Sequence, residues 1–382
     1  MTDRISYFSG GQILAVYALG SAALLVVGIQ PVLFGTLLES GILDLPTLSC
    51  VATLETITSG CAIVVASALF PLTRVRAVGI IALLCFALAN AISALALDLM
   101  ALLTARIAAG FAAGVCIWLT TSMIVRTAKP ERLYGYFVSV HTLAQGIAVA
   151  ILALLIVPEF GWRGCFALVA VAGLFPLVCS RLIPAELSPL PRPSEHDGKL
   201  TPAMAIAALV TLLQMIMTIA IWAFLEPMGR LTGIEPQTLQ LIVSGLLFFQ
   251  VLAAAFAGFV APHLPTLGAQ FITSGSIFIL SFYLLTIAQW SSHWFAPTAI
   301  LFSFCWIMIL PLQTKLAIDV DPTGRLALSV PAIQIVGSAI APIAAGFAAG
   351  TGPVSGVALV AIVCGGVTLL ALLVLGVWRN VE

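Results

Sequence analysis

The chain has 382 residues, with 15 basic and 15 acidic side chains and therefore a formal net charge of zero. This balance indicates neither a basic surface for nucleic acid nor an acidic disordered tail. Only 8% of the residues are charged, whereas 62% are hydrophobic, and a soluble domain of this length could not bury so much apolar surface. A bilayer can accept it, because ~20 apolar residues cross ~30 Å of hydrocarbon as a helix with every backbone group satisfied internally.

Twelve apolar stretches in chain order predict twelve transmembrane helices, at residues 12–36, 46–69, 77–97, 99–125, 135–157, 164–180, 202–229, 236–260, 268–288, 295–318, 326–350 and 354–377. An even number places both termini on one side of the membrane. The loops on that side hold eleven of the Lys and Arg residues, and the opposite loops hold Arg163 and Arg230. The positive-inside rule then predicts that both termini are cytoplasmic. We expect an integral protein of a bacterial inner membrane.

A polar stretch near the middle of the chain, Pro184–Thr201, contains four prolines and mixed charge and indicates a solvated linker. It predicts a six-helix half at 1–184, a linker at 185–201 and a second six-helix half at 202–382. Proline-containing loops recur at a nearly constant offset, after the second and eighth stretches and after the fourth and tenth, which favours a duplicated unit. The predicted fold is an all-α membrane protein with two six-helix, pseudo-symmetric halves.

Several motifs occur in the order that one transporter family shows. The fourth stretch contains Arg106-xxx-Gly110-xxx-Gly114, the loop before the sixth reads Gly161-Trp-Arg163, and the eleventh follows Asp321-xxx-Arg325. Over essentially its whole length the chain resembles the major facilitator superfamily. Two departures stand out. Pro71 occupies the position where that family usually has an aspartate after the second span, and the fifth span lacks the Gly-Pro pair of many drug/proton antiporters.

Four ionisable side chains other than histidine and cysteine lie inside the predicted spans. Glu55, Arg106 and Glu226 lie in the outer half of their spans, and Lys315 lies near a cytoplasmic end. A charge at membrane depth costs at least ~2.5–3.5 kcal/mol, so each must face protein or water. Arg106 is interpreted as a substrate-binding group, a partner for Glu55 or a structural donor. Glu55, Glu226 and His141 are the candidate proton-coupling groups, since acids in low dielectric and histidines can titrate near neutral pH. The alternatives are a fixed ion pair for Glu55, an interfacial position for Glu226 and a neutral, hydrogen-bonded ring for His141.

Polar and aromatic side chains repeat at three- and four-residue steps on several predicted spans. The seventh span gives Thr211, Gln214, Thr218 and Trp222 on one face. The resemblance implies that spans one, four, seven and ten line a central cavity. The candidate substrate-binding residues are Tyr17, Arg106, Trp118, Gln145, Gln214, Trp222, Trp306, Gln313 and Gln334.

The sequence shows no P-loop, no metal-ligand cluster and no nucleophile elbow, so we expect no enzyme activity, no cofactor and no metal. The resemblance implies a monomeric secondary active transporter that works by alternating access, with protons or sodium as coupling ion and lipid around it. The expected substrate is a small amphipathic organic solute, aromatic or carboxylated. The alternatives are drug efflux by proton antiport, and a sensor or lipid scramblase that transports nothing.

Overall fold

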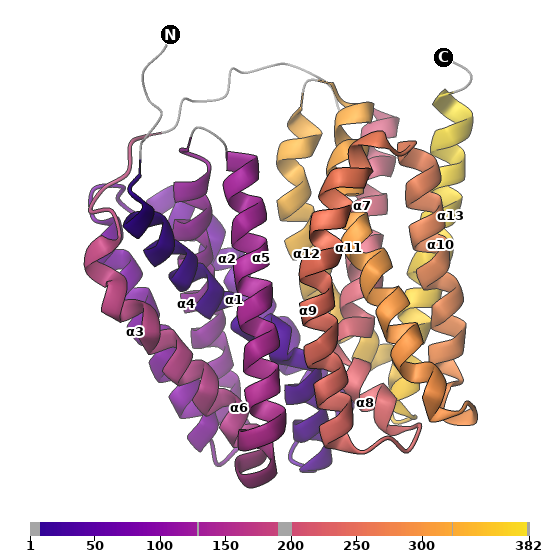
Figure 1. Ribbon diagram of the computed structural model, residues 1–382, viewed down its shortest axis with the longest axis horizontal. Coiled ribbons are helices and arrows are strands. Elements are labelled where there is room, and N and C mark those ends of the chain that lie inside the picture. The colour runs from indigo at the N-terminus through magenta and orange to yellow at the C-terminus, as the bar shows by residue number, and fades with distance from the viewer. Residues whose placement is uncertain (1–7, 128–129, 190–200, 323, 380–382) are drawn as a thin grey trace. The chain divides into compact units, whose positions relative to one another are not determined.

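The computed structural model describes residues 8–127, 130–189, 201–322 and 324–379, and these residues form helices and no strands. Within those ranges, eleven helical segments are long and apolar enough to cross a membrane. One of them, Arg132–Leu182, has 51 residues, or roughly 75 Å if it were one straight helix. Gly161 interrupts it with φ 54 and ψ −142, and the chain turns back there (Figure 1). This segment therefore contains the predicted fifth and sixth spans, which confirms the predicted all-helical membrane fold.

The helices follow the predicted order. They are α1 (Gly10–Glu39), α2 (Leu45–Leu69), α3 (Val75–Leu95), α4 (Leu99–Ile124), α5 (Pro130–Ile151), α6 (Val157–Leu174), α7 (Pro202–Ala223), α8 (Leu225–Arg230), α9 (Pro236–Val260), α10 (Thr266–Leu285), α11 (Phe295–Val320), α12 (Arg325–Ala349) and α13 (Ala358–Arg379). A π-helical turn at Leu152–Ile156 joins α5 to α6. Short 3₁₀ segments lie at Phe175–Leu182, Ala261–His263, Ile287–Gln289, Ser292–Trp294 and Val354–Val357.

Local capping explains several helix ends. The Asp98 carboxylate accepts a hydrogen bond from Ala101 N at 2.8 Å and begins α4, and the Thr201 hydroxyl accepts one from Met204 N at 3.2 Å and begins α7. Such side chains satisfy backbone donors that have no partner in the first turn. Gly350, with φ 54, ends α12 in a conformation that a side chain would strain.

The contacts divide the chain into two compact units, one of residues 1–29 and 54–196 and one of residues 30–53 and 197–382. In the first unit α3 packs against α4 and α6, and in the second α7 packs against α12 and α13 (Figure 1). The last third of α1 and the first third of α2 pack with the second unit.

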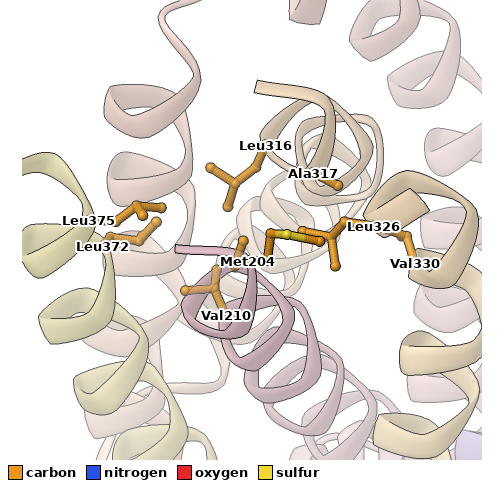
Figure 2. Close-up of a cluster of buried hydrophobic side chains, with 9 residues drawn as sticks. Met204, Val210, Leu316, Ala317, Leu326, Val330, Leu372 and Leu375 are labelled. Atoms are coloured by element: carbon orange, nitrogen blue, oxygen red, sulfur yellow. The ribbon is translucent and has the colours of Figure 1, made fainter. Parts of the chain in front are cut away.

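The core of the second unit is made of aliphatic side chains from four helices. Met204 and Val210 of α7, Leu316 of α11 and Leu326 of α12 are buried together, next to two leucines of α13 (Figure 2). Because lipid is as apolar as these side chains, close packing rather than the exclusion of water has to hold the helices together.

Candidate functional site

In the first unit, Arg106 lies at the centre of a buried polar network. Its side chain is 2% exposed, and Nη1 is 3.1 Å from Glu55 Oε1. Nε and Nη2 donate to Ser93 Oγ at 3.0 and 2.7 Å, and Nη2 also donates to Asn90 Oδ1 at 2.9 Å. The guanidinium carbon lies 4.5 Å from the centre of the Phe166 ring. α2, α3, α4 and α6 thus all contribute to holding this one charge.

Two glycines of α4 bring Glu55 to Arg106. A Cβ added at Gly110 would collide with the backbone carbonyl of Glu55, and one added at Gly114 would collide with that of Ser59. The absence of side chains lets α2 approach α4 backbone to backbone, as the small-residue spacing of the sequence indicates. The predicted pairing of Arg106 with Glu55 is therefore present as a direct contact.

The remaining candidates of the first unit lie apart from this network. Tyr17 Oη donates to Leu133 O at 2.5 Å, and its ring lies 5.6 Å from that of Phe137, which also lies 5.1 Å from His141. His141 Nδ1 is buried and has no hydrogen-bond partner within the described part of the chain. Gln145 donates to the backbone oxygen of Leu24 at 2.7 Å.

Trp118 is buried at 4% exposure, and its ring lies 6.0 Å from that of Phe70 in an edge-on arrangement. A Cβ added at Gly28 would collide with the side chain of Gln145, so α1 and α5 are in direct contact at this point. In the structure Gln145 therefore bonds to a neighbouring helix backbone.

In the second unit, four glutamines from four helices form a continuous hydrogen-bonded chain, which we call the amide chain. Gln334 of α12 donates to Gln313 of α11 at 2.7 Å, and Gln313 donates to Gln214 of α7 at 3.0 Å. Gln214 in turn donates to Gln270 of α10 at 2.5 Å and to Ser274 Oγ at 2.8 Å. Gln214, Gln270 and Gln313 are fully buried.

The amide chain ends in an unused donor. Gln270 Nε2 is buried, and no hydrogen-bond partner for it lies among the residues that the structure describes. A buried donor without a partner costs about 1–3 kcal/mol, so such a group marks a place where a ligand or water can bind.

Three aromatic rings lie about two helical turns from the amide chain along α7 and α11 and form what we call the aromatic cluster. The Trp222 and Trp306 rings are 5.4 Å apart, and Phe302 stacks on Trp306 at 6.0 Å. Trp306 Nε1 is buried, and the described residues provide no acceptor for it. The amide chain and the aromatic cluster thus each have an unused hydrogen-bond donor.

Glu226 occupies a different position from the one the sequence predicts. The span helix α7 ends at Ala223, short of the predicted residue 229, and Glu226 lies on the separate helix α8, outside the Pro202–Ala223 span. Its side chain is 0% exposed. Arg230 Nε donates to both carboxylate oxygens of Glu226, at 2.9 and 3.1 Å. Burial raises the pKa of Glu226 to about 7, even though Arg230 acts in the opposite direction.

A second acid shares this arginine. Arg230 Nη1 lies 2.8 Å from Glu39 Oε2 at the end of α1, and the Glu39 side chain is 56% exposed. We call Glu39, Glu226 and Arg230 the charged triad.

Sequence reasoning did not identify several partners of the predicted residues, which are Asn90, Ser93, Phe166, Gln270, Ser274, Glu39 and Arg230. Some left a signal. Asn90 and Ser93 lie three residues apart in an otherwise apolar span, Gln270 and Ser274 lie four apart, and Glu226 and Arg230 lie four apart. Each spacing puts both polar groups on one face of a helix.

Lys315 lies at the α9 end of the second unit, where its ammonium group donates to the carbonyl oxygens of Ala261, Pro262 and Leu264 at 3.1, 3.0 and 2.6 Å. These carbonyls follow the last turn of α9, where acceptors have no helical partner. Lys315 therefore provides a hydrogen-bond donor for the carbonyl groups at the end of α9.

The chain is similar in sequence to a protein family and in structure to several solved proteins. A family model described as Major Facilitator Superfamily matches residues 10–335. A comparison with curated proteins gave no match. The crystal structure of a D-xylose-proton symporter is 12% identical, with a TM-score of 0.71 over 94% of this chain and 97% of that one.

Two further solved structures are similar. A mutant of the nucleoside transporter NupG is 12% identical, with a TM-score of 0.71 over 95% of this chain and 99% of that one. The xylose transporter XylE from E. coli, in a partially occluded inward-open conformation, is 13% identical, with a TM-score of 0.69 over 97% and 100% of the two chains. At these identities the likeness shows a shared fold.

Proposed function

Given that this chain belongs to the major facilitator superfamily, we propose that it is a proton-coupled secondary active transporter of a small, neutral solute rich in hydrogen-bonding groups. The observation that carries this proposal is the amide chain, with the aromatic cluster two turns away on the same helices. Amides offer both donors and acceptors without net charge, and the flat faces of tryptophans pack against the apolar face of a ring.

Charge supports a neutral substrate over a carboxylated one. Recognition of a carboxylate favours an arginine with free donors. In the second unit, Arg230 is engaged by Glu39 and Glu226, and in the first unit Arg106 is engaged by Glu55, Asn90 and Ser93. The unused donors of the amide chain and of the aromatic cluster, on Gln270 and Trp306, both belong to neutral side chains. Arg230 Nη2 also lacks a hydrogen bond, but it lies 2.9 Å from a Glu226 oxygen in an ion pair.

Sugars and nucleosides have this chemistry, since each combines a ring with several hydroxyl groups. Two of the structurally similar proteins are a D-xylose-proton symporter and a nucleoside transporter. Because those proteins are 12% identical to this chain, the amide chain carries the argument for the substrate class, and the neighbours supply only candidate compounds.

Among the three predicted proton-coupling groups, the geometry favours Glu226. Glu55 is fixed in place by the network around Arg106, whose Nη1 lies 3.1 Å from it and whose other nitrogens are held by Ser93 and Asn90. The His141 ring lies 5.1 Å from that of Phe137 on the same helix, α5. Glu226 is buried beside a single arginine that it shares with a second acid. Burial and the like charge of that acid both favour the protonated carboxyl, so Glu226 is the candidate for binding a proton near neutral pH.

We further propose that both termini are cytoplasmic and that the halves are residues 1–184 and 202–382, joined by a linker at 185–201. The charge asymmetry of the loops supports this orientation. In intact cells, a membrane-impermeant maleimide should then label single cysteines placed at Asp98 or Ser292 above the background of the unsubstituted chain. It should not label cysteines placed at Arg74 or Glu186, and labelling at Glu186 would reverse the orientation.

A ligand panel tests the substrate class. We expect neutral sugars and nucleosides to raise the unfolding temperature of the detergent-purified protein, while carboxylated and cationic solutes of the same size leave it unchanged. Mass action requires that any solute bound by the folded state alone stabilises it, by about 2.7 kcal/mol at a concentration 100 times Kd. Stabilisation by carboxylates alone, or by lipophilic cations alone, would contradict the proposal and would favour the carboxylate or drug-efflux alternatives respectively.

A further inference from the structure

The charged triad joins the end of α1 to α8 through one guanidinium group. Arg230 Nη1 is 2.8 Å from Glu39, and its Nη2 is 2.9 Å from Glu226. The two acids differ sharply in their surroundings, since the side chain of Glu39 is 56% exposed and that of Glu226 is 0% exposed. Two carboxylates thus share one cation, and only one of them can reach water.

The end of α1 closes over Glu226. A Cβ added at Gly35 would collide with the Glu226 carboxylate, so the backbone of α1 lies directly on it. One residue earlier, the Phe34 ring packs 5.2 Å from the Phe224 ring, which is fully buried. Both contacts, Gly35 with Glu226 and Phe34 with Phe224, are made by the last turns of α1. If the end of α1 moved away from α8, water would reach Glu226.

The charged groups that act on Glu226 are Arg230 of its own helix and Glu39 of α1. Within the described residues, α7, α9 and the 3₁₀ turn Val354–Val357 also pack on α8, and none of them adds a charge to this set. The pKa of Glu226 is therefore set by three effects: burial and the like charge of Glu39 raise it, and Arg230 lowers it.

We propose that Glu226 is a proton-binding site whose protonation holds the end of α1 closed over α8 and whose deprotonation releases it. The reason is thermodynamic linkage: a proton binds more tightly to the state in which the carboxyl is buried than to a state in which it is hydrated. A neutral carboxyl can remain under Gly35, whereas an ionised one gains hydration when α1 moves away.

The sign of the pH effect follows from the two pKa values. Burial raises the pKa of Glu226 to about 7 in the closed state, and a hydrated glutamate has a pKa of about 4.3. Below the higher value the closed state binds the proton and is favoured, and above it this advantage is lost. Between pH 6 and pH 8 the ratio of closed to released molecules should fall about tenfold.

This inference deepens the proposed function and rests on its orientation, in which the end of α1 faces outside. A proton taken up from outside would then close the outer end of the carrier over the bound solute. Release of that proton to the cytoplasm would allow the outer end to open again.

Hydrogen–deuterium exchange of the ligand-free protein in lipid nanodiscs tests the proposal. The variant is Glu226→Gln, which mimics the protonated carboxyl, and the matched control is Glu235→Gln, which makes the same change at an exposed acid of the following loop. Peptides covering residues 34–41 and 224–231 are compared with the wild type at one pH at a time, so that the chemical exchange rate cancels.

We expect Glu226→Gln to exchange more slowly than the wild type in these peptides at both pH values, because glutamine is neutral in the released state as well. The difference should be about tenfold larger at pH 8 than at pH 6, since at pH 6 the wild-type carboxyl is itself protonated in most closed molecules. Glu235→Gln should follow the wild type at both pH values. Faster exchange in Glu226→Gln at pH 8 would show that the carboxylate simply fastens α1 to Arg230, and equal exchange would show that its charge does not matter. Either result would overturn the proposal.

A second measurement does not depend on the folding of the variant. In the wild type alone, protection of the same peptides, normalised to the rates of an unstructured peptide, should fall about tenfold from pH 6 to pH 8. Unchanged protection would also overturn the proposal. The exchange assay contains no solute, so its result does not depend on whether the protein transports one. Conversely, if protonation of Glu226 does not control the end of α1, solute uptake measured in a separate assay is not affected by that result.

Discussion

Replacing Arg106 by alanine should lower the free energy of unfolding by about 3–5 kcal/mol, because it leaves the Glu55 carboxylate without its cation inside the bundle. The change also removes the donors that reach Ser93 and Asn90 and the cation that lies on Phe166. Four helices lose a shared partner at once. Chemical or thermal unfolding of the detergent-purified protein measures the effect.

Arg132→Ala is the matched control. Arg132 is an exposed arginine whose Nε donates to the Tyr136 hydroxyl at 2.8 Å, so its removal should cost less than about 1 kcal/mol. Changing Arg106 and Glu55 together to leucine should restore much of the stability, because a buried ion pair replaced by apolar side chains leaves no charge behind. A stable Arg106→Ala protein that has lost only transport would contradict this structural role and would place Arg106 in the substrate site.

Replacing Gln313 by leucine should reduce kcat/KM for solute uptake by about tenfold to a hundredfold, because Gln313 is the middle link of the amide chain. Leucine has a similar volume but neither donates nor accepts. Gln214 would lose a donor and Gln334 an acceptor, so the chain would break on both sides of the change. Uptake into proteoliposomes at graded solute concentrations gives the two kinetic constants.

Gln250→Leu separates loss of recognition from loss of a buried hydrogen bond. Gln250 of α9 is also buried, and it donates to Ser303 Oγ at 3.3 Å outside the amide chain. The two variants remove the same chemical group from the same unit. Equal loss of uptake in both would contradict a specific role for the amide chain and would indicate a general packing defect.

The fold could be predicted from the sequence because the membrane imposes a simple rule on helix length and polarity. Three features depend on local sequence alone. Apolar runs determine the spans, the charge of the loops determines the orientation, and the glycines of α4 determine where a neighbouring helix can approach closely. The end of α7 was less well predicted, since the apolar character continues past Ala223 while the helix stops there. Pro227 is the local feature that marks the break, because it lacks the N–H that would bond the carbonyl of Ala223 four residues earlier.

The candidate site was predicted in part, and the reason is geometric. A stripe such as Gln214 and Trp222 on one helix is visible in sequence, but its partners lie on other helices at positions that only packing determines. Gln270 joins the amide chain from α10, where its four-residue spacing from Ser274 indicates a polar face but not which helix that face meets. Glu39 and Arg230 lie at helix ends. Charged residues are common there because they contact water, so their position alone does not predict an ion pair with a buried acid.

Uptake of the solute identified by the ligand panel, measured in proteoliposomes with an imposed pH gradient, tests the transport account most directly. We expect accumulation above the outside concentration when the outside is acidic, its abolition by a protonophore, and no effect of a sodium gradient. Glu226→Gln should keep equilibrium exchange of solute but lose this accumulation, while Glu235→Gln should keep both. A protein that binds the solute without moving it, or that accumulates it only with sodium, would contradict proton-coupled transport by this chain.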